Sequence, residues 1–197
     1  MALSKIQAES MNLADTFAFT GTVSGVGGFK KLYTNSTTST VTSLDIGDTY
    51  INTTYDTYYV VGHVRPVNVG VNARLYLKNS SGQITGSVYS MDLNNLHHGE
   101  AYDTTTYVRL NYSTLGNGLG YGSSFSFFIE HVNSANYPCA VKTFWRTFHT
   151  AGQPEGGYSI GGLIDTQYAT IVKGFIIDAS DGNGYRAHDI TVYGIEK

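Results

Sequence analysis

Short runs in which apolar and polar residues alternate recur along the chain and predict β-strands. In residues 71–78, every second side chain from Val71 to Leu77 is apolar, while Asn72, Arg74 and the others between them are polar or amphipathic. This period of two predicts a strand with one face in the core. Residues 55–67 also alternate, but both faces carry bulky side chains. This second pattern predicts a strand inside a sandwich, with a second surface nearby.

Similar patterns predict a fold built almost entirely of strands. Stretches rich in Gly, Asn and Asp separate the runs, and only residues 4–15 are a candidate helix, with a poor match to a 3.6-residue period. Further strands are expected over residues 32–35, 40–46, 87–93, 107–112, 125–132, 139–149, 158–164, 170–178 and 190–195. Many short strands without interleaved helices favour an antiparallel arrangement. We therefore expect an all-β fold, an antiparallel jelly-roll-like β-sandwich.

The first 28 residues differ from the rest and predict an N-terminal arm before a sandwich domain at residues 29–197. The arm carries apolar side chains that a single small domain need not bury: Leu3, Ile6, Met11, Leu13, Phe17 and Phe19. One interpretation is that the arm orders on a neighbouring subunit of a symmetric assembly. The other is that it folds back as an edge strand of its own sandwich.

Composition excludes several classes of protein. The chain has 197 residues, of which 14% are charged and 13% aromatic, too aromatic for a disordered segment. Its net charge of -3 and the lack of a basic block disfavour binding to nucleic acid. No run approaches the roughly 20 apolar residues of a membrane span, and residues 1–16 lack the apolar centre of a signal peptide. A single cysteine, Cys139, excludes an internal disulfide framework.

Three segments resemble ligand-binding loops without matching them. Residues 116–122 are glycine-rich but lack the Lys-Ser/Thr pair of a phosphate loop. His97 and His98, close to Glu100, offer metal-ligand chemistry, yet adjacent residues of a strand point to opposite faces. Residues 178–183 are oxygen-rich, but their spacing is not that of a calcium loop. Loops and turns are the competing interpretation, so no metal and no cofactor is predicted.

Catalytic patterns are missing from the sequence, whereas residues suited to recognition are frequent. No G-x-S-x-G motif occurs and the carboxylates are scattered, so we expect no enzyme. Tyr combined with Ser, Gly and Asn provides rigid contact area beside adaptable hydrogen bonding. The alternative is that these tyrosines cap the edges of the sandwich. Five aromatic residues are candidates for surface recognition: Tyr102, Tyr121, Tyr137, Trp145 and Tyr185.

Three segments carry a resemblance to a known class of protein. The opening Met1-Ala2-Leu3-Ser4-Lys5-Ile6 with Phe17-Ala18-Phe19-Thr20-Gly21-Thr22-Val23-Ser24-Gly25 resembles the start of small virion proteins of tailed phages, especially marine and cyanobacterial ones. Residues 55–61, and the ending from residue 156 to 195, are similar to the β domains of such proteins. The resemblance covers under half of the chain.

The resemblance implies a non-enzymatic component of a phage particle, either a capsid decoration or a tail-fibre component. Such a protein is expected to be a homo-oligomer, most simply a trimer, that contacts other virion proteins and is assembled in the host cytoplasm. Its arm is expected to anchor it and its sandwich to be displayed on the particle surface. The alternative is a carbohydrate-binding adhesin that recognises host surface glycans.

Overall fold

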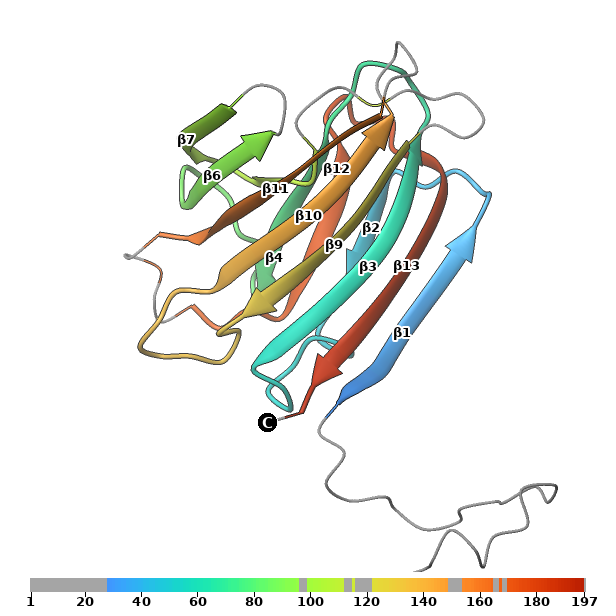
Figure 1. Cartoon of the computed structure of the whole chain (residues 1–197). Helices are drawn as coiled ribbons and strands as arrows, with labels where there is room; N and C mark the ends of the chain where they lie inside the picture. Colours follow the sequence, from blue (N-terminus) through green and yellow to red (C-terminus); the bar gives the residue numbers. More distant parts are fainter. Residues whose placement is uncertain are drawn as a thin grey trace, which may run out of the picture.

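The computed structural model describes residues 28–95, 99–111, 115, 122–148, 154–164, 167 and 170–196. They form two antiparallel β-sheets that lie face to face (Figure 1), which confirms the predicted all-β sandwich. This part of the chain contains no α-helix, and so no helix long and apolar enough to cross a membrane. The jelly-roll-like connectivity remains a prediction.

The larger sheet has eight strands and faces the viewer in Figure 1. In spatial order its strands are β1 (Phe29–Thr37), β13 (Tyr185–Ile195), β3 (Thr57–Pro66), β9 (Gly122–Glu130), β10 (Ala140–Phe148), β11 (Pro154–Leu163), β6 (Tyr89–Asn95) and β7 (Gly99–Thr105). The last strand of the chain therefore lies between the first and the third. Pairings this distant in sequence close the sheet only once the chain has folded as a whole.

The smaller sheet lies behind the larger one (Figure 1). Its strands are β2 (Ser43–Ile46), β12 (Gly174–Ala179), β4 (Ala73–Asn79) and β5 (Gly82–Gln83), and β8 (Val108–Arg109) pairs with β4. The predicted strands at residues 71–78 and 170–178 thus become β4 and β12, which pair with each other. Their apolar faces, which include Leu75, Leu77 and Phe175, are fully buried.

The core lies between the two sheets and is rich in aromatic rings. Phe127 of the larger sheet meets Phe175 of the smaller sheet edge to face, with ring centroids 5.4 Å apart. Tyr89 is completely buried, and its hydroxyl accepts a hydrogen bond from the amide of Leu77 at 2.9 Å and donates one to the carbonyl of Ile84 at 3.1 Å. Burial raises the pKa of the Tyr89 hydroxyl, so this donor stays protonated.

The alternation predicted for residues 55–67 is confirmed in β3. Tyr58, Val60 and Val64 are fully buried, whereas Tyr59 and His63 lie on the opposite, outer face of the sheet. The bulk expected on both faces is therefore present. The described residues, however, place no second layer over this outer face (Figure 1).

Three sequence-based expectations need comment. β7 lies where a polar loop around Glu100 was expected, so that part of the loop prediction is wrong, while His97 and His98 lie outside the described residues. β1 begins at Phe29, the first residue after the predicted arm. The arm itself stays a prediction, since its residues Leu3, Ile6, Met11, Leu13, Phe17 and Phe19 lie outside the described part of the chain.

Candidate functional site

The outer face of the eight-stranded sheet carries large side chains in a continuous row. Directly paired residues of neighbouring antiparallel strands place their side chains on the same face. The register aligns one row across six strands from β13 to β6: Tyr193, Tyr59, Phe128, Lys142, Ile160 and Asp92. Ile160 is 49% exposed. Because contiguous exposed apolar patches can mark binding surfaces, this face is a candidate site.

Aromatic rings cluster at the β1 end of this row. The rings of Tyr59 and Phe128 lie 4.7 Å apart, and the ring of Phe29 meets those of Tyr59 at 5.3 Å and Tyr193 at 6.1 Å. Phe29 is 56% exposed. These edge-on and tilted contacts hold the rings in fixed positions on the open side of the sheet.

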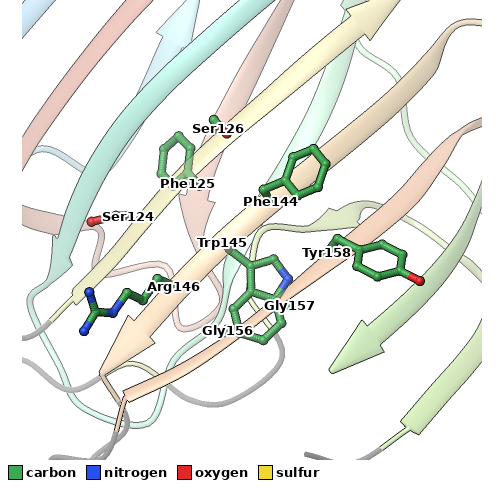
Figure 2. A pocket seen from close by; sticks show the side chains of 9 residues that line it. All are labelled: Ser124, Phe125, Ser126, Phe144, Trp145, Arg146, Gly156, Gly157 and Tyr158. Atoms are coloured by element: carbon green, nitrogen blue, oxygen red, sulfur yellow. The ribbon is translucent and has the colours of Figure 1, made fainter. Parts of the chain in front are cut away.

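A groove of about 530 Å³ lies on the same sheet, over β9, β10 and β11 (Figure 2). Phe144 of β10 and Tyr158 of β11 are paired residues, so their side chains project from neighbouring positions on the outer face. Phe144 is 56% exposed. Gly156 pairs with Arg146 and leaves a gap beside the arginine. Nine residues line the groove: Ser124, Phe125, Ser126, Phe144, Trp145, Arg146, Gly156, Gly157 and Tyr158.

Arg146 gives the groove a positive charge. Its guanidinium lies 5.2 Å from the ring centroid of Phe148, a cation–π contact that orients it without neutralising it. The neighbouring cation Lys142 is bound to Glu130, with Nζ and Oε2 2.7 Å apart. Within the described residues Arg146 has no carboxylate partner. The groove therefore combines apolar rings, serine hydroxyls and one cation that has no carboxylate partner among the described residues.

Two residues predicted to lie at the surface are buried, and for them that prediction is wrong. Tyr185 is fully buried because the register of β13 shifts between Tyr185 and Ala187, a bulge that turns its ring into the core. Its hydroxyl donates a hydrogen bond to the carbonyl of Asp178 at 2.6 Å. Trp145 is only 5% exposed, and its indole N–H is buried without a hydrogen-bond partner among the described residues.

The remaining recognition candidates have different outcomes. Tyr137 is 63% exposed in the connection between β9 and β10, with its ring 5.5 Å from that of His131. Tyr102 lies in β7, paired with Asp92. Tyr121 lies outside the described residues. Sequence reasoning overlooked Phe144 and Arg146, although β10 carries large residues on both faces, the same signal that singled out residues 55–67.

A row of Asp189, His63 and Ser124 on this face resembles a catalytic triad but lacks its geometry. His63 Nδ1 lies 3.1 Å from the Ser124 hydroxyl, whereas no hydrogen bond joins His63 to Asp189 in the described structure. Ser124 also lies within β9, whose backbone pairs with β3 on one side and β10 on the other. Its neighbouring amides are therefore engaged in the sheet and are not available to stabilise an oxyanion.

The other candidate chemistry is used for structure. Both carboxylate oxygens of Asp178 accept hydrogen bonds from Arg74 at 2.8 Å, and this hydrogen bonding is the main reason why the pKa of Arg74 is raised. Asp181 accepts from the side-chain amides of Asn68 at 2.8 Å and Asn183 at 3.0 Å. Cys139 is buried, which raises the pKa of its thiol. In the described part of the chain no three His, Cys, Asp or Glu residues are placed to hold a metal ion.

We expect His188 to make the stability of the sandwich depend on pH. It is 3% exposed, and neither ring nitrogen has a hydrogen-bond partner among the described residues. Burial lowers its pKa, although the negative charge of Asp189 opposes this, and burial also lowers the pKa of His63. Near pH 7.5 both histidines are mostly neutral in the folded and in the unfolded chain. Below about pH 6.5 these histidines take up protons in the unfolded chain more readily than in the folded chain, where their pKa values are lower. The free energy of unfolding therefore decreases as the pH falls.

We expect His188→Leu to reduce this loss, measured as the free energy of urea unfolding at pH 7.5 and pH 5.5. Each histidine contributes at most about 1.4 kcal/mol per pH unit to the slope. The matched variant His63→Gln removes the contribution of the second histidine. If the double variant loses as much free energy of unfolding between pH 7.5 and pH 5.5 as the wild type, neither imidazole causes the pH dependence.

The chain matches no family model, no curated protein and no solved structure.

Proposed function

We propose that the chain is a non-enzymatic structural component of a tailed-phage particle, a homo-oligomer anchored by its N-terminal arm that displays the β-sandwich outward. The observation that supports this best is the outer face of the eight-stranded sheet. Phe29, Phe144 and Ile160 are large, apolar and about half exposed on that face. A surface of this kind suits contact with a partner outside the particle, and a sandwich displayed outward would leave it accessible. The resemblance of both ends of the sequence to virion proteins is the reason for proposing a phage particle.

The oligomeric state is the first property to measure. A trimer predicts a mass near three times 21.4 kDa in light scattering of the full chain. The arm is the part expected to join the chain to other virion proteins, while the outer sheet face remains free for recognition. A strictly monomeric chain at all concentrations would contradict the proposal.

Deletion of residues 1–16 tests the anchoring role. We expect the shortened chain to keep the unfolding midpoint of the sandwich but to be lost from purified particles of the phage that encodes it. Quantitative mass spectrometry of those particles, with the full-length chain as control, measures the incorporation. If the deletion instead prevents folding, the segment belongs to the core and the anchoring role is wrong.

A carbohydrate-binding adhesin is the second candidate function, and the groove on β10 and β11 favours it. Aromatic rings beside hydroxyl and guanidinium groups provide both an apolar platform and polar contacts, as small-molecule sites do. The two candidates are compatible, because a displayed virion protein can also bind a host glycan. Particles that lack the chain and still adsorb normally to host cells would favour a purely structural role.

A further inference from the structure

We propose that the groove lined by Phe144, Arg146, Gly156 and Tyr158 binds a hexuronate, a pyranose ring that carries a carboxylate, within an acidic glycan. The inference rests on the adhesin form of the proposed function and names its ligand class and its residues. It moves the recognition site from the tyrosine-rich loops to the open face of the sheet (Figure 2).

The paired rings of Phe144 and Tyr158 favour a ring-shaped ligand. They project from paired positions of β10 and β11 on the outer face, and Phe144 is 56% exposed although burial would stabilise it. A pyranose has an apolar C–H face that packs on an aromatic ring and a rim of hydroxyls that does not. An aromatic surface with polar groups at its edge satisfies both parts of such a ring.

Two serine hydroxyls lie beside the aromatic and arginine side chains, and that of Ser124 is also 3.1 Å from His63 Nδ1. Ser126 is the direct partner of Phe144, and Ser124 that of Arg146, so both serines lie on the same face as the groove. Their hydroxyls can donate as well as accept hydrogen bonds. The volume of about 530 Å³ falls within the range of small-molecule sites.

The charge of Arg146 selects an acidic sugar over a neutral one. A guanidinium binds a carboxylate through two parallel hydrogen bonds, and such charge-assisted contacts are the strong ones. Lys142, the other cation of β10 on this face, is already paired with Glu130, whereas Arg146 lacks a carboxylate among the described residues. The carboxylate of the ligand would supply that partner.

Gly156 leaves open the space in which the sugar would lie. A Cβ added there would meet nothing closer than the carbonyl oxygen of Trp145, at 3.4 Å, so the backbone tolerates a side chain. The outward direction follows from its pairing with Arg146. Gly156→Val therefore fills the groove while the strand is retained, since β-branched residues suit strands. This variant separates occupancy of the groove from stability of the fold.

Calorimetric titration of the full chain tests the inference. The probes are tetrasaccharides of galacturonate, mannuronate, guluronate and glucuronate, together with neutral hexose tetrasaccharides of the same linkages. We expect at least one hexuronate to bind more tightly than its neutral counterpart. Arg146→Gln should weaken that binding about 10- to 100-fold, and Phe144→Ala or Tyr158→Ala about tenfold each. Gly156→Val should abolish it.

Tyr137→Ala is the matched control, because it removes an exposed aromatic ring outside the groove and should leave the affinity unchanged. Three results would overturn the inference: no hexuronate binds, the neutral sugars bind equally well, or Gly156→Val binds like the wild type. If Phe144→Ala lowers the mass of the oligomer instead, a second copy occupies the face and the inference is also wrong. If the chain is found in purified particles but binds no sugar, the hexuronate inference is wrong while the proposed virion role is supported.

Discussion

Gly184→Ala should destabilise the protein far more than Gly182→Ala, although the two glycines have the same φ. Both have φ of 76°, in the left-handed region. At Gly184 an added Cβ would lie 2.0 Å from the carbonyl oxygen of Val41, whereas at Gly182 nothing lies within 4 Å. Real Cβ atoms never approach backbone this closely, so the chain around Val41 has to move.

A shift of the chain around Val41 would break its backbone hydrogen bonds to Tyr185. Val41 and Tyr185 exchange two hydrogen bonds, of 2.9 and 2.8 Å, that tie the segment before β2 to the start of β13. Left-handed strain costs about 1–2 kcal/mol at either glycine. Loss of the two hydrogen bonds adds about 1 kcal/mol each at Gly184 only. We therefore expect about 3–4 kcal/mol for Gly184→Ala, measured by urea unfolding. Equal losses for both variants would show that the close approach is absent.

Phe127→Ala should destabilise the sandwich by about 3–5 kcal/mol, because it empties the contact between the two sheets. Phe127 is fully buried in β9 and packs edge to face on Phe175 of β12, with a stacked contact to Phe125 at a centroid distance of 5.8 Å. The surrounding strands are paired on both sides and cannot collapse into the space. The cavity therefore remains and adds to the lost burial.

Phe144→Ala is the matched control for this substitution. It removes the same side chain from the next strand of the same sheet, but from the outer face, where Phe144 is 56% exposed. We expect a change within about 0.5 kcal/mol in thermal or urea unfolding. This small effect also matters for the sugar titration, because it means that a loss of binding in Phe144→Ala reports on the groove. A large loss of stability in both variants would contradict the assignment of the two faces.

The period of two determined most of the strands, because side-chain alternation is a local property of the backbone. The inward set of Ala73, Leu75 and Leu77 in β4, with Val71 just before it, was predicted residue by residue and is buried as expected. β7 was missed, because Gly99–Thr105 contains few apolar residues and pairs as an edge strand, where one side of the backbone remains free. Edge strands can be polar, so their sequence signal is weak.

The site depended on information that no local pattern contains. Tyr185 looked like a loop tyrosine beside Gly184, but a single bulge in β13 turned it into the core. Phe144 and Tyr158 become neighbours only through the register between β10 and β11. The sequence by itself therefore determined the all-β class and much of the inward face of the strands, through alternation. Only the tertiary structure decided which bulky faces stay open, because strand order and register arise from contacts between residues far apart in the chain.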